Sequence, residues 1–205
     1  MTAAFVGSIP TTPAIKINIY TTIKKRGMKM VHIVEKDLFK SDANFLVHQC
    51  NCEGFMGSGV AKQVADLFPH VKKEYLRYIN HCNKNNIRLL GTIQFVPTES
   101  WAIVMVDTIK NNRVEVYDNN YQYIVNLFGQ EEIGTGLQTD IKAVENGLIE
   151  LKNMIQKLEP VPSVAIPYGM SSVRGGANWK DIYKIIEKIF GNTNIDVQIC
   201  KCNKG

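Results

Sequence analysis

The sequence predicts an α/β fold in three layers, with a central sheet covered by helices on both faces. Short apolar runs of strand length alternate along the chain with segments whose apolar residues recur at helical spacing, and this alternation is typical of layered α/β domains. The length of 205 residues fits one domain and is enough to bury a core. Two of the strand-like runs lead directly into glycine-rich loops, which in such folds lie where ligands bind.

The first 27 residues differ in character from the rest of the chain. They contain four basic residues and no acidic residue, and prolines interrupt them. We therefore predict a flexible basic tail over residues 1–27 and a single domain over residues 28–205. The run 15–20 could pair as an edge strand, although nothing requires it. Met28 opens the first convincing strand, so we take it as the biological start.

Strands are predicted wherever β-branched and aromatic residues form a short apolar run. These runs lie at residues 28–34, 44–50, 92–96, 101–106, 113–117, 121–128, 161–167 and 194–200. Turn-forming residues separate the runs in the middle of the chain. The region from about Trp101 to Tyr121 is predicted to be an inserted hairpin.

Helices are predicted wherever apolar residues share one helical face. Such segments lie at residues 58–68, 70–84, 139–159 and 178–190. The first places Val60, Val64 and Leu67 on one face. Asn178 can cap the last helix, and Gly191 is suited to end it.

Composition excludes several classes of protein. The net charge of +5 comes mostly from the tail, because residues 28–205 carry 20 basic and 19 acidic side chains. A nucleic-acid binder usually has a basic face, so we do not expect nucleic acid as a partner. No run of 18 apolar residues or secretory signal is present, so no membrane association is expected. We predict a monomer in the cytoplasm, which would be the host cytoplasm if the protein is phage-encoded.

The five cysteines are predicted to be free thiols in a reducing compartment, because a disulfide framework usually uses an even number. Cys50 and Cys52 form one Cys-x-Cys pair, and Cys200 and Cys202 form another. Together the pairs could make a four-cysteine zinc site. Strand alternation explains the spacing without a metal, so we predict neither a metal nor a cofactor.

Two strand–loop–helix segments carry the functional signal. In residues 48–61 an apolar strand enters a loop with Gly57 and Gly59, and a helix follows. Glycine allows close approach of a ligand, and the free amides of a helix N-terminus suit a diphosphate. Residues 167–179 repeat this arrangement with small residues, which suggests one ligand held between two loops. The alternative is a pair of tight turns that bind nothing.

The order and spacing of several motifs resemble those of macro domains of the ADP-ribose-1″-phosphate-processing group. This group includes fungal phosphatases and phage and bacterial proteins, and it resembles hydrolases that remove ADP-ribose from glutamate or DNA bases. The matching segments are 35–39, His48-x-Cys50-Asn51-Cys52, 57–61, 89–91, 126–130, 139–140 and 175–179. The resemblance implies a three-layer α/β/α macro domain with a central mixed, largely parallel sheet.

The resemblance also implies the ligand and the residues that bind it. The implied partner is ADP-ribose or ADP-ribose 1″-phosphate, with Asp37 accepting a hydrogen bond from the adenine amino group and Asn51 reaching the distal ribose. Gln130 belongs to the region that closes over this ribose. The complete set of implied ligand-binding residues is Asp37, Leu38, Asn51, Gly57, Ser58, Gly59, Val60, Gln130, Ser171, Ser172, Val173, Arg174 and Gly175.

Departures from the family pattern leave the function between two classes. The glutamate- and DNA-directed hydrolases use a lysine near the distal ribose and, in some, an aspartate in the second loop, and neither is cleanly placed here; Arg174 lies near the position of that acid. His48 and Asn51 are the predicted catalytic residues, although His48 could equally be a buried structural histidine. We therefore expect a hydrolase acting on ADP-ribose 1″-phosphate or an ADP-ribosyl ester. The alternative is a non-catalytic reader or scavenger of ADP-ribose or a NAD-derived metabolite.

Overall fold

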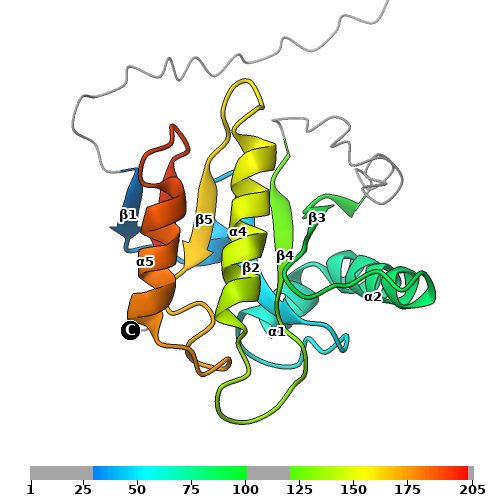
Figure 1. The fold of residues 1–205 in the computed structure, drawn as a ribbon. Helices are drawn as coiled ribbons and strands as arrows, with labels where there is room; N and C mark the ends of the chain where they lie inside the picture. Colours follow the sequence, from blue (N-terminus) through cyan, green and yellow to red (C-terminus); the bar gives the residue numbers. More distant parts are fainter. Residues whose placement is uncertain (1–29, 101–120, 203–205) are drawn as a thin grey trace, which may run out of the picture.

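The computed structural model describes residues 30–100 and 121–202, which fold into a mixed sheet between two helical layers (Figure 1). The strands are β1 (Val31–Val34), β2 (Phe45–Asn51), β3 (Ile93–Pro97), β4 (Tyr123–Gln130), β5 (Val164–Pro167) and β6 (Val197–Cys200). The helices are the 3₁₀ helix η1 (Leu38–Lys40), α1 (Gly59–Leu67), α2 (Pro69–Lys84), α4 (Ile141–Ile155) and α5 (Trp179–Phe190). The predicted three-layer α/β/α fold is confirmed.

The sheet has the order β1-β6-β5-β2-β4-β3, and among these described strands only β3 runs antiparallel to its neighbour. Helices α4 and α5 lie side by side on one face, and α1 and α2 lie on the other (Figure 1). The central strands β5 and β2 are therefore covered on both faces. This explains why β5 is apolar throughout and why β2 begins with three consecutive apolar residues, rather than with alternating apolar and polar residues.

Alternation along β2 divides its side chains between the two faces of the sheet. Phe45 and Val47 pack into the core beneath α4 and α5. Leu46 and Cys50 pack on the opposite face, which α1 and α2 cover. His48 lies between these two in the alternation, so its imidazole is directed under α1 and α2 and not into the α4/α5 core.

Local signals in the sequence fix the helix ends. Asp140 accepts a hydrogen bond from the Ala143 amide and caps α4, and Asn178 caps α5 in the same way. Gly191 ends α5 as predicted. Leu67, predicted on the apolar stripe of α1, lies at the last residue of that helix and is 56% exposed.

Some predictions fall outside the described residues. These are the tail over residues 1–27, the strands at 101–106 and 113–117, and all but the last residue of the predicted hairpin. In the part of the chain that is described, no helix is both long and apolar enough to cross a membrane.

Candidate functional site

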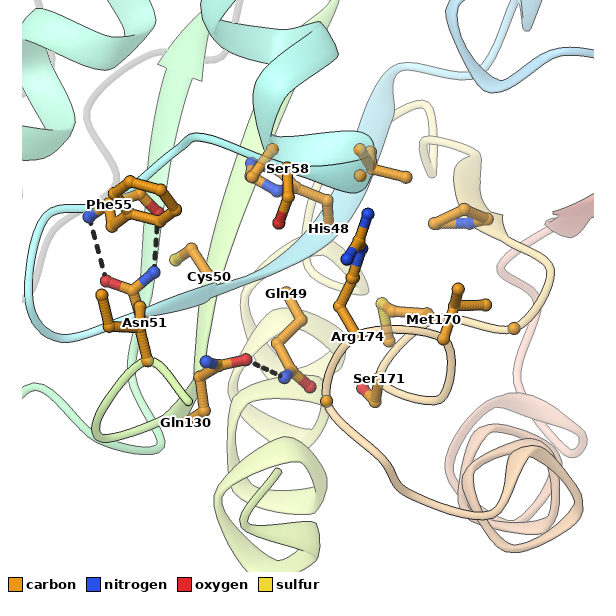
Figure 2. A pocket seen from close by; sticks show the side chains of 18 of the residues that line it. His48, Gln49, Cys50, Asn51, Phe55, Ser58, Gln130, Met170, Ser171 and Arg174 are labelled. Atoms are coloured by element: carbon orange, nitrogen blue, oxygen red, sulfur yellow. Dashed lines mark hydrogen bonds between the residues drawn. The ribbon is translucent and has the colours of Figure 1, made fainter. Parts of the chain in front are cut away.

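A cavity of about 470 Å³ lies at the carboxyl ends of β2 and β5, where two loops face each other (Figure 2). The two strands are parallel neighbours, but the chain leaves them toward opposite faces, to α1 after β2 and to α5 after β5. Ligands of open α/β sheets bind where neighbouring strands diverge in this way. The cavity is lined by residues 48–51, Phe55, 58–61, Gln63, Gln130, 133–134, 167–171 and 173–175.

The first loop ends at the N-terminus of α1. Gly59 is the first residue of this helix and has φ +58°, a left-handed conformation that favours glycine. Ser58 is the N-cap, yet its hydroxyl makes no capping hydrogen bond. The first amides of a helix have no partner within the helix. The loop therefore presents amide donors and a free hydroxyl to the cavity, which suits an anion.

Asn51 holds the first loop in shape. Its Oδ1 accepts from the amides of Glu53 and Phe55, and its Nδ2 donates to the Phe55 carbonyl at 2.7 Å. The Tyr75 hydroxyl adds hydrogen bonds to the carbonyl and to Oδ1 of the same residue. The acceptor of this side chain is fully used, so only one Nδ2 proton is free for a ligand.

The second loop turns sharply at Ser171, which is buried and has φ +69°. The Ser171 hydroxyl is buried without a hydrogen-bond partner in the described part of the chain, while the Ser171 carbonyl accepts from Thr139 Oγ1 at 3.0 Å. A side chain at Gly175 would overlap Thr139 Oγ1 and the Ser171 carbonyl. Glycine is therefore required at residue 175 for the loop to pack this closely.

Hydrogen bonds connect the second loop to the ends of β2 and β4. Gln49 Nε2 donates to Gln130 Oε1 at 2.9 Å and to Thr139 Oγ1 at 3.0 Å. The amides of Gln138 and Thr139 both donate to the Gly175 carbonyl. The lower wall of the cavity in Figure 2 is thus cross-linked, and Gln130 is held beside Gln49.

Arg174 extends from the second loop across the cavity toward the first loop (Figure 2). Its Cγ atom lies 3.6 Å from the position that a Cβ on Gly59 would occupy. Among the described residues its guanidinium forms no ion pair. A charged group without a counter-ion beside a helix N-terminus makes this side of the cavity electropositive.

His48 is 1% exposed and lines the cavity beneath the first turn of α1, beside Ser58 (Figure 2). Its Nε2 lies 2.7 Å from Asn126 Oδ1. Burial lowers the pKa of His48 from its ordinary 6.5 to about 4, although the Asn126 side chain and the Gln49 backbone both oppose this shift. The imidazole is therefore neutral at neutral pH.

Cys50 also lines the cavity, but its thiol is suited to packing and not to nucleophilic attack. Its Sγ donates to the Leu127 carbonyl at 3.4 Å. Burial raises the pKa of this thiol well above its ordinary value, and the thiolate is the reactive form. All five cysteines are unpaired. No group of three or more His, Cys, Asp or Glu side chains is placed to hold a metal within residues 30–100 and 121–202.

Four of the predicted residues do not line the cavity. Asp37 caps η1 through its Oδ1, at the carboxyl end of β1, and Leu38 is buried in the core. Gly57 is packed against the Phe55 ring, and Ser172 turns back toward the Met170 carbonyl. The other predicted residues are brought together as lining: His48, Asn51, Ser58, Gly59, Val60, Gln130, Ser171, Val173, Arg174 and Gly175.

Sequence reasoning missed several lining residues. Phe55 and Tyr168 are about half exposed there, and Gln49 cross-links the wall. Tyr168 and Phe55 lie inside the two glycine-rich segments, so their position in those loops was an available signal. Ile133 and Gly134 carried no comparable signal, because only the folded chain brings their loop to the cavity.

Known proteins of similar sequence and structure define the class of this domain. No family model matches the chain. The ADP-ribose 1″-phosphate phosphatase of Meyerozyma guilliermondii is 28% identical over 146 residues, covering 65% of this chain and 76% of that protein. The same-named protein of Debaryomyces hansenii is 23% identical over 184 residues, covering 83% and 99%.

Solved structures agree with these sequence matches. The macrodomain of Mycobacterium tuberculosis DarG superposes with a TM-score of 0.60 at 21% identity, covering 85% of this chain and 99% of that chain. Thermosipho africanus DarTG in complex with ADP-ribose gives a TM-score of 0.62 at 22% identity, covering 87% and 44%. The chain therefore has the fold of a macrodomain, which confirms the resemblance predicted from the motifs. Within this class, the sequence relatives named above are ADP-ribose 1″-phosphate phosphatases.

Proposed function

We propose that the protein binds ADP-ribose and hydrolyses ADP-ribose 1″-phosphate to ADP-ribose and phosphate in the cavity between its two loops. The observation that carries this proposal is the meeting of the α1 N-terminus and the Arg174 side chain across one cavity. Amides, a hydroxyl and a guanidinium directed at the same space favour an anionic ligand with several phosphoryl oxygens. The named activity of the sequence relatives supports the same substrate.

The ligand is proposed to run along the carboxyl edge of the sheet. Residues 58–60 and 171–175 hold the diphosphate from two sides, and Asn51 and Gln130 lie near the distal ribose. Asp37 follows β1, which is separated from β5 by β6 alone in the sheet order. The adenine end would therefore extend from the cavity over β6 toward Asp37, whose Oδ1 already accepts from the Phe39 amide.

The chemical step is proposed to be attack of water on the phosphorus of the 1″-phosphate. The oxygen–phosphorus bond to the ribose breaks, water supplies the new oxygen of phosphate, and its proton goes to the departing ribose oxygen. The lining supplies little acid–base chemistry, because His48 has a pKa of about 4 and Cys50 holds its proton. Positioning and amide electrostatics then supply most of the rate, and slow turnover is expected.

A second candidate is a reader or scavenger that binds ADP-ribose without turnover. The lining residues include no aspartate, glutamate or lysine within the described part of the chain. Asn51 also has its acceptor committed to the loop. A cavity built for binding, with weak means of activating water, favours this alternative. In either case we propose a monomer working in the cytoplasm of a bacterium or of a phage-infected cell.

Release of inorganic phosphate from ADP-ribose 1″-phosphate distinguishes the two candidates. The proposal expects saturable release that ADP-ribose inhibits competitively. An Asn51→Ala variant should lose release, and an exposed α2 variant such as Lys72→Ala should keep it. Tight binding of ADP-ribose without any release of phosphate would support the reader or scavenger instead. If the protein neither releases phosphate nor binds ADP-ribose, the whole proposal is contradicted.

A further inference from the structure

Three polar side chains form a buried row across the sheet beneath α2. His48, Asn126 and Gln94 lie directly opposite one another on β2, β4 and β3. They are 1%, 0% and 7% exposed, respectively. Neither the sequence motifs nor the proposed function gives a role to Asn126 or Gln94, yet the row ends in a histidine that lines the cavity.

The hydrogen bonds along this row have a fixed direction. Gln94 Nε2 donates to the Glu74 carbonyl of α2 at 3.0 Å, and a carbonyl can only accept. Gln94 Oε1 is therefore directed at Asn126, whose Nδ2 donates to it at 2.9 Å. This leaves Asn126 Oδ1 facing His48 Nε2 at 2.7 Å. Because Asn126 Oδ1 can only accept, the proton of the imidazole lies on Nε2.

The other imidazole nitrogen is an acceptor without a donor. With the proton on Nε2, the neutral ring carries its lone pair on Nδ1. His48 Nδ1 is buried and has no hydrogen-bond partner among residues 30–100 and 121–202. Buried polar atoms in folded proteins nearly always have a partner, so an orphan in a cavity wall calls for one. Figure 2 places this ring beside Ser58, where the first loop meets the cavity.

We infer that Gln94 and Asn126 are positioning residues that hold His48 as the Nε2–H tautomer, so that Nδ1 accepts a hydrogen bond from a hydroxyl group of the ligand or from the attacking water. The inference rests on the proposed function for the identity of that ligand. A phosphate oxygen is itself an acceptor, so His48 repels it. Arg174 and the α1 amides attract phosphate instead. His48 therefore favours a hydroxyl-bearing part of the ligand beside it, and the phosphates bind nearer Arg174 and the α1 amides.

A structural role for the row makes a different prediction. If these residues only fill the space under α2, a ligand will not change the magnetic environment of Nδ1. Loss of Gln94 will then cost stability but leave the imidazole tautomer and ligand affinity unchanged. The two accounts therefore differ in a spectroscopic quantity that does not depend on stability.

The test is ¹⁵N NMR of the full chain labelled at its imidazole nitrogens. In the free protein, His48 should show a protonated, pyrrole-type Nε2 and an unprotonated, pyridine-type Nδ1. Saturating ADP-ribose should move the Nδ1 resonance upfield, as acceptance of a hydrogen bond does, and leave Nε2 protonated. A protonated Nδ1 in the free protein would overturn the inference. An unmoved Nδ1 resonance, while the loop amides shift, would also overturn it and leave ADP-ribose binding intact.

A variant pair tests the positioning role. Gln94→Leu frees the Asn126 amide to turn, so a second tautomer of His48 should appear and ADP-ribose affinity should fall roughly 2- to 10-fold, the worth of one hydrogen bond. Gln122→Leu is the control, because Gln122 also donates to backbone carbonyls, those of Ser41 and Ala43, but does not contact His48. Equal effects of the two variants on tautomer and affinity would contradict the inference. If Gln94→Leu does not fold, the ¹⁵N spectra of the unaltered protein still show which tautomer His48 adopts and whether Nδ1 accepts a hydrogen bond from the ligand.

The failure of the proposed function looks different in the same spectra. Loop amide resonances that do not move with ADP-ribose or ADP-ribose 1″-phosphate would show that neither ligand binds. That result contradicts the proposed function and removes the ligand part of the inference with it. The tautomer of His48 in the free protein still tests the direction of the hydrogen bonds from His48 to Gln94.

Discussion

Ser171 combines two unfavourable features in a single residue. It has a left-handed backbone, which costs an L-residue roughly 1–2 kcal/mol, and its buried hydroxyl lacks a hydrogen-bond partner among the described residues. A glycine would remove both costs. That a serine stands in the cavity wall is therefore most simply explained if its hydroxyl contacts the ligand.

This explanation predicts opposite signs for stability and affinity. Ser171→Gly should raise the free energy of unfolding by roughly 1 kcal/mol, since relief of strain exceeds the added entropy of the unfolded chain. The same variant should weaken ADP-ribose binding several-fold. Asn86→Gly is the matched control, because Asn86 also has a positive φ but lies after α2, away from the cavity. Denaturant unfolding measures the stability of both variants, and calorimetric titration measures their affinity for ADP-ribose. Undiminished affinity of the Ser171→Gly variant would show that the hydroxyl does not contact the ligand.

Burial of neutral His48 makes stability depend on pH in a definite direction. The folded pKa of His48 is about 4, below its ordinary 6.5, so the unfolded chain binds this proton more readily between those values. The contribution is present above pH 6.5 and is lost as pH falls toward 4. Acidification across this window should cost roughly 3 kcal/mol through His48.

His48→Gln isolates this contribution, because glutamine keeps a donor near Asn126 but does not titrate. Denaturant unfolding at several pH values should show a flatter profile for the variant than for the unaltered protein. The carboxylates titrate in both proteins, so only the difference between the profiles reports His48. Identical slopes would mean that the imidazole is protonated or accessible in the folded state.

Among the elements, the helices and strands were predictable from the sequence because their signals are local. Periodic apolar residues and the caps Asp140 and Asn178 act within a few positions of the chain. The sheet order was not predictable in this way, because pairing joins segments far apart. The buried row from His48 to Gln94 could not be predicted for the same reason, because its residues become neighbours only when β2, β4 and β3 pair.

The candidate site was predictable to a similar extent. Each glycine-rich loop follows a strand directly, and residues of both loops line one cavity. The commitment of Asn51 to its own loop could not be foreseen, because it depends on Tyr75 from α2 and on the path of residues 53–55. Motifs therefore indicated which loops line the cavity, whereas hydrogen-bond partners decide which atoms remain free.

The contact between the two loops gives a prediction at the scale of elements. Arg174 is the charged residue that reaches from one loop over the other. Arg174→Ala should weaken ADP-ribose binding about tenfold, because a charge-assisted contact to phosphate is lost, and should reduce the salt dependence of the affinity. Arg77→Ala, which removes an exposed arginine paired with Glu74 on α2, is the control. Equal ADP-ribose affinities of the Arg174→Ala and Arg77→Ala variants would show that Arg174 does not contact the phosphates.

At the scale of the whole molecule, the fold creates one site where the chain leaves two central strands in opposite directions. The α1 N-terminus arrives from one face of the sheet and the β5–α5 loop from the other. Residues 28–205 carry 20 basic and 19 acidic side chains, so the net charge of this part of the chain does little to attract an anionic ligand. Recognition then depends on the local field of the two loops.

Calorimetric titration of the full chain with ADP-ribose tests the central claim most directly. The account predicts one site per chain with a dissociation constant at micromolar levels or tighter. It also predicts that Gly59→Val loses this binding while retaining a folded far-ultraviolet spectrum, because valine fills the space at the helix N-terminus and does not tolerate the left-handed backbone found there. Absence of binding to the unaltered protein, or undiminished binding to the folded Gly59→Val variant, would contradict the account.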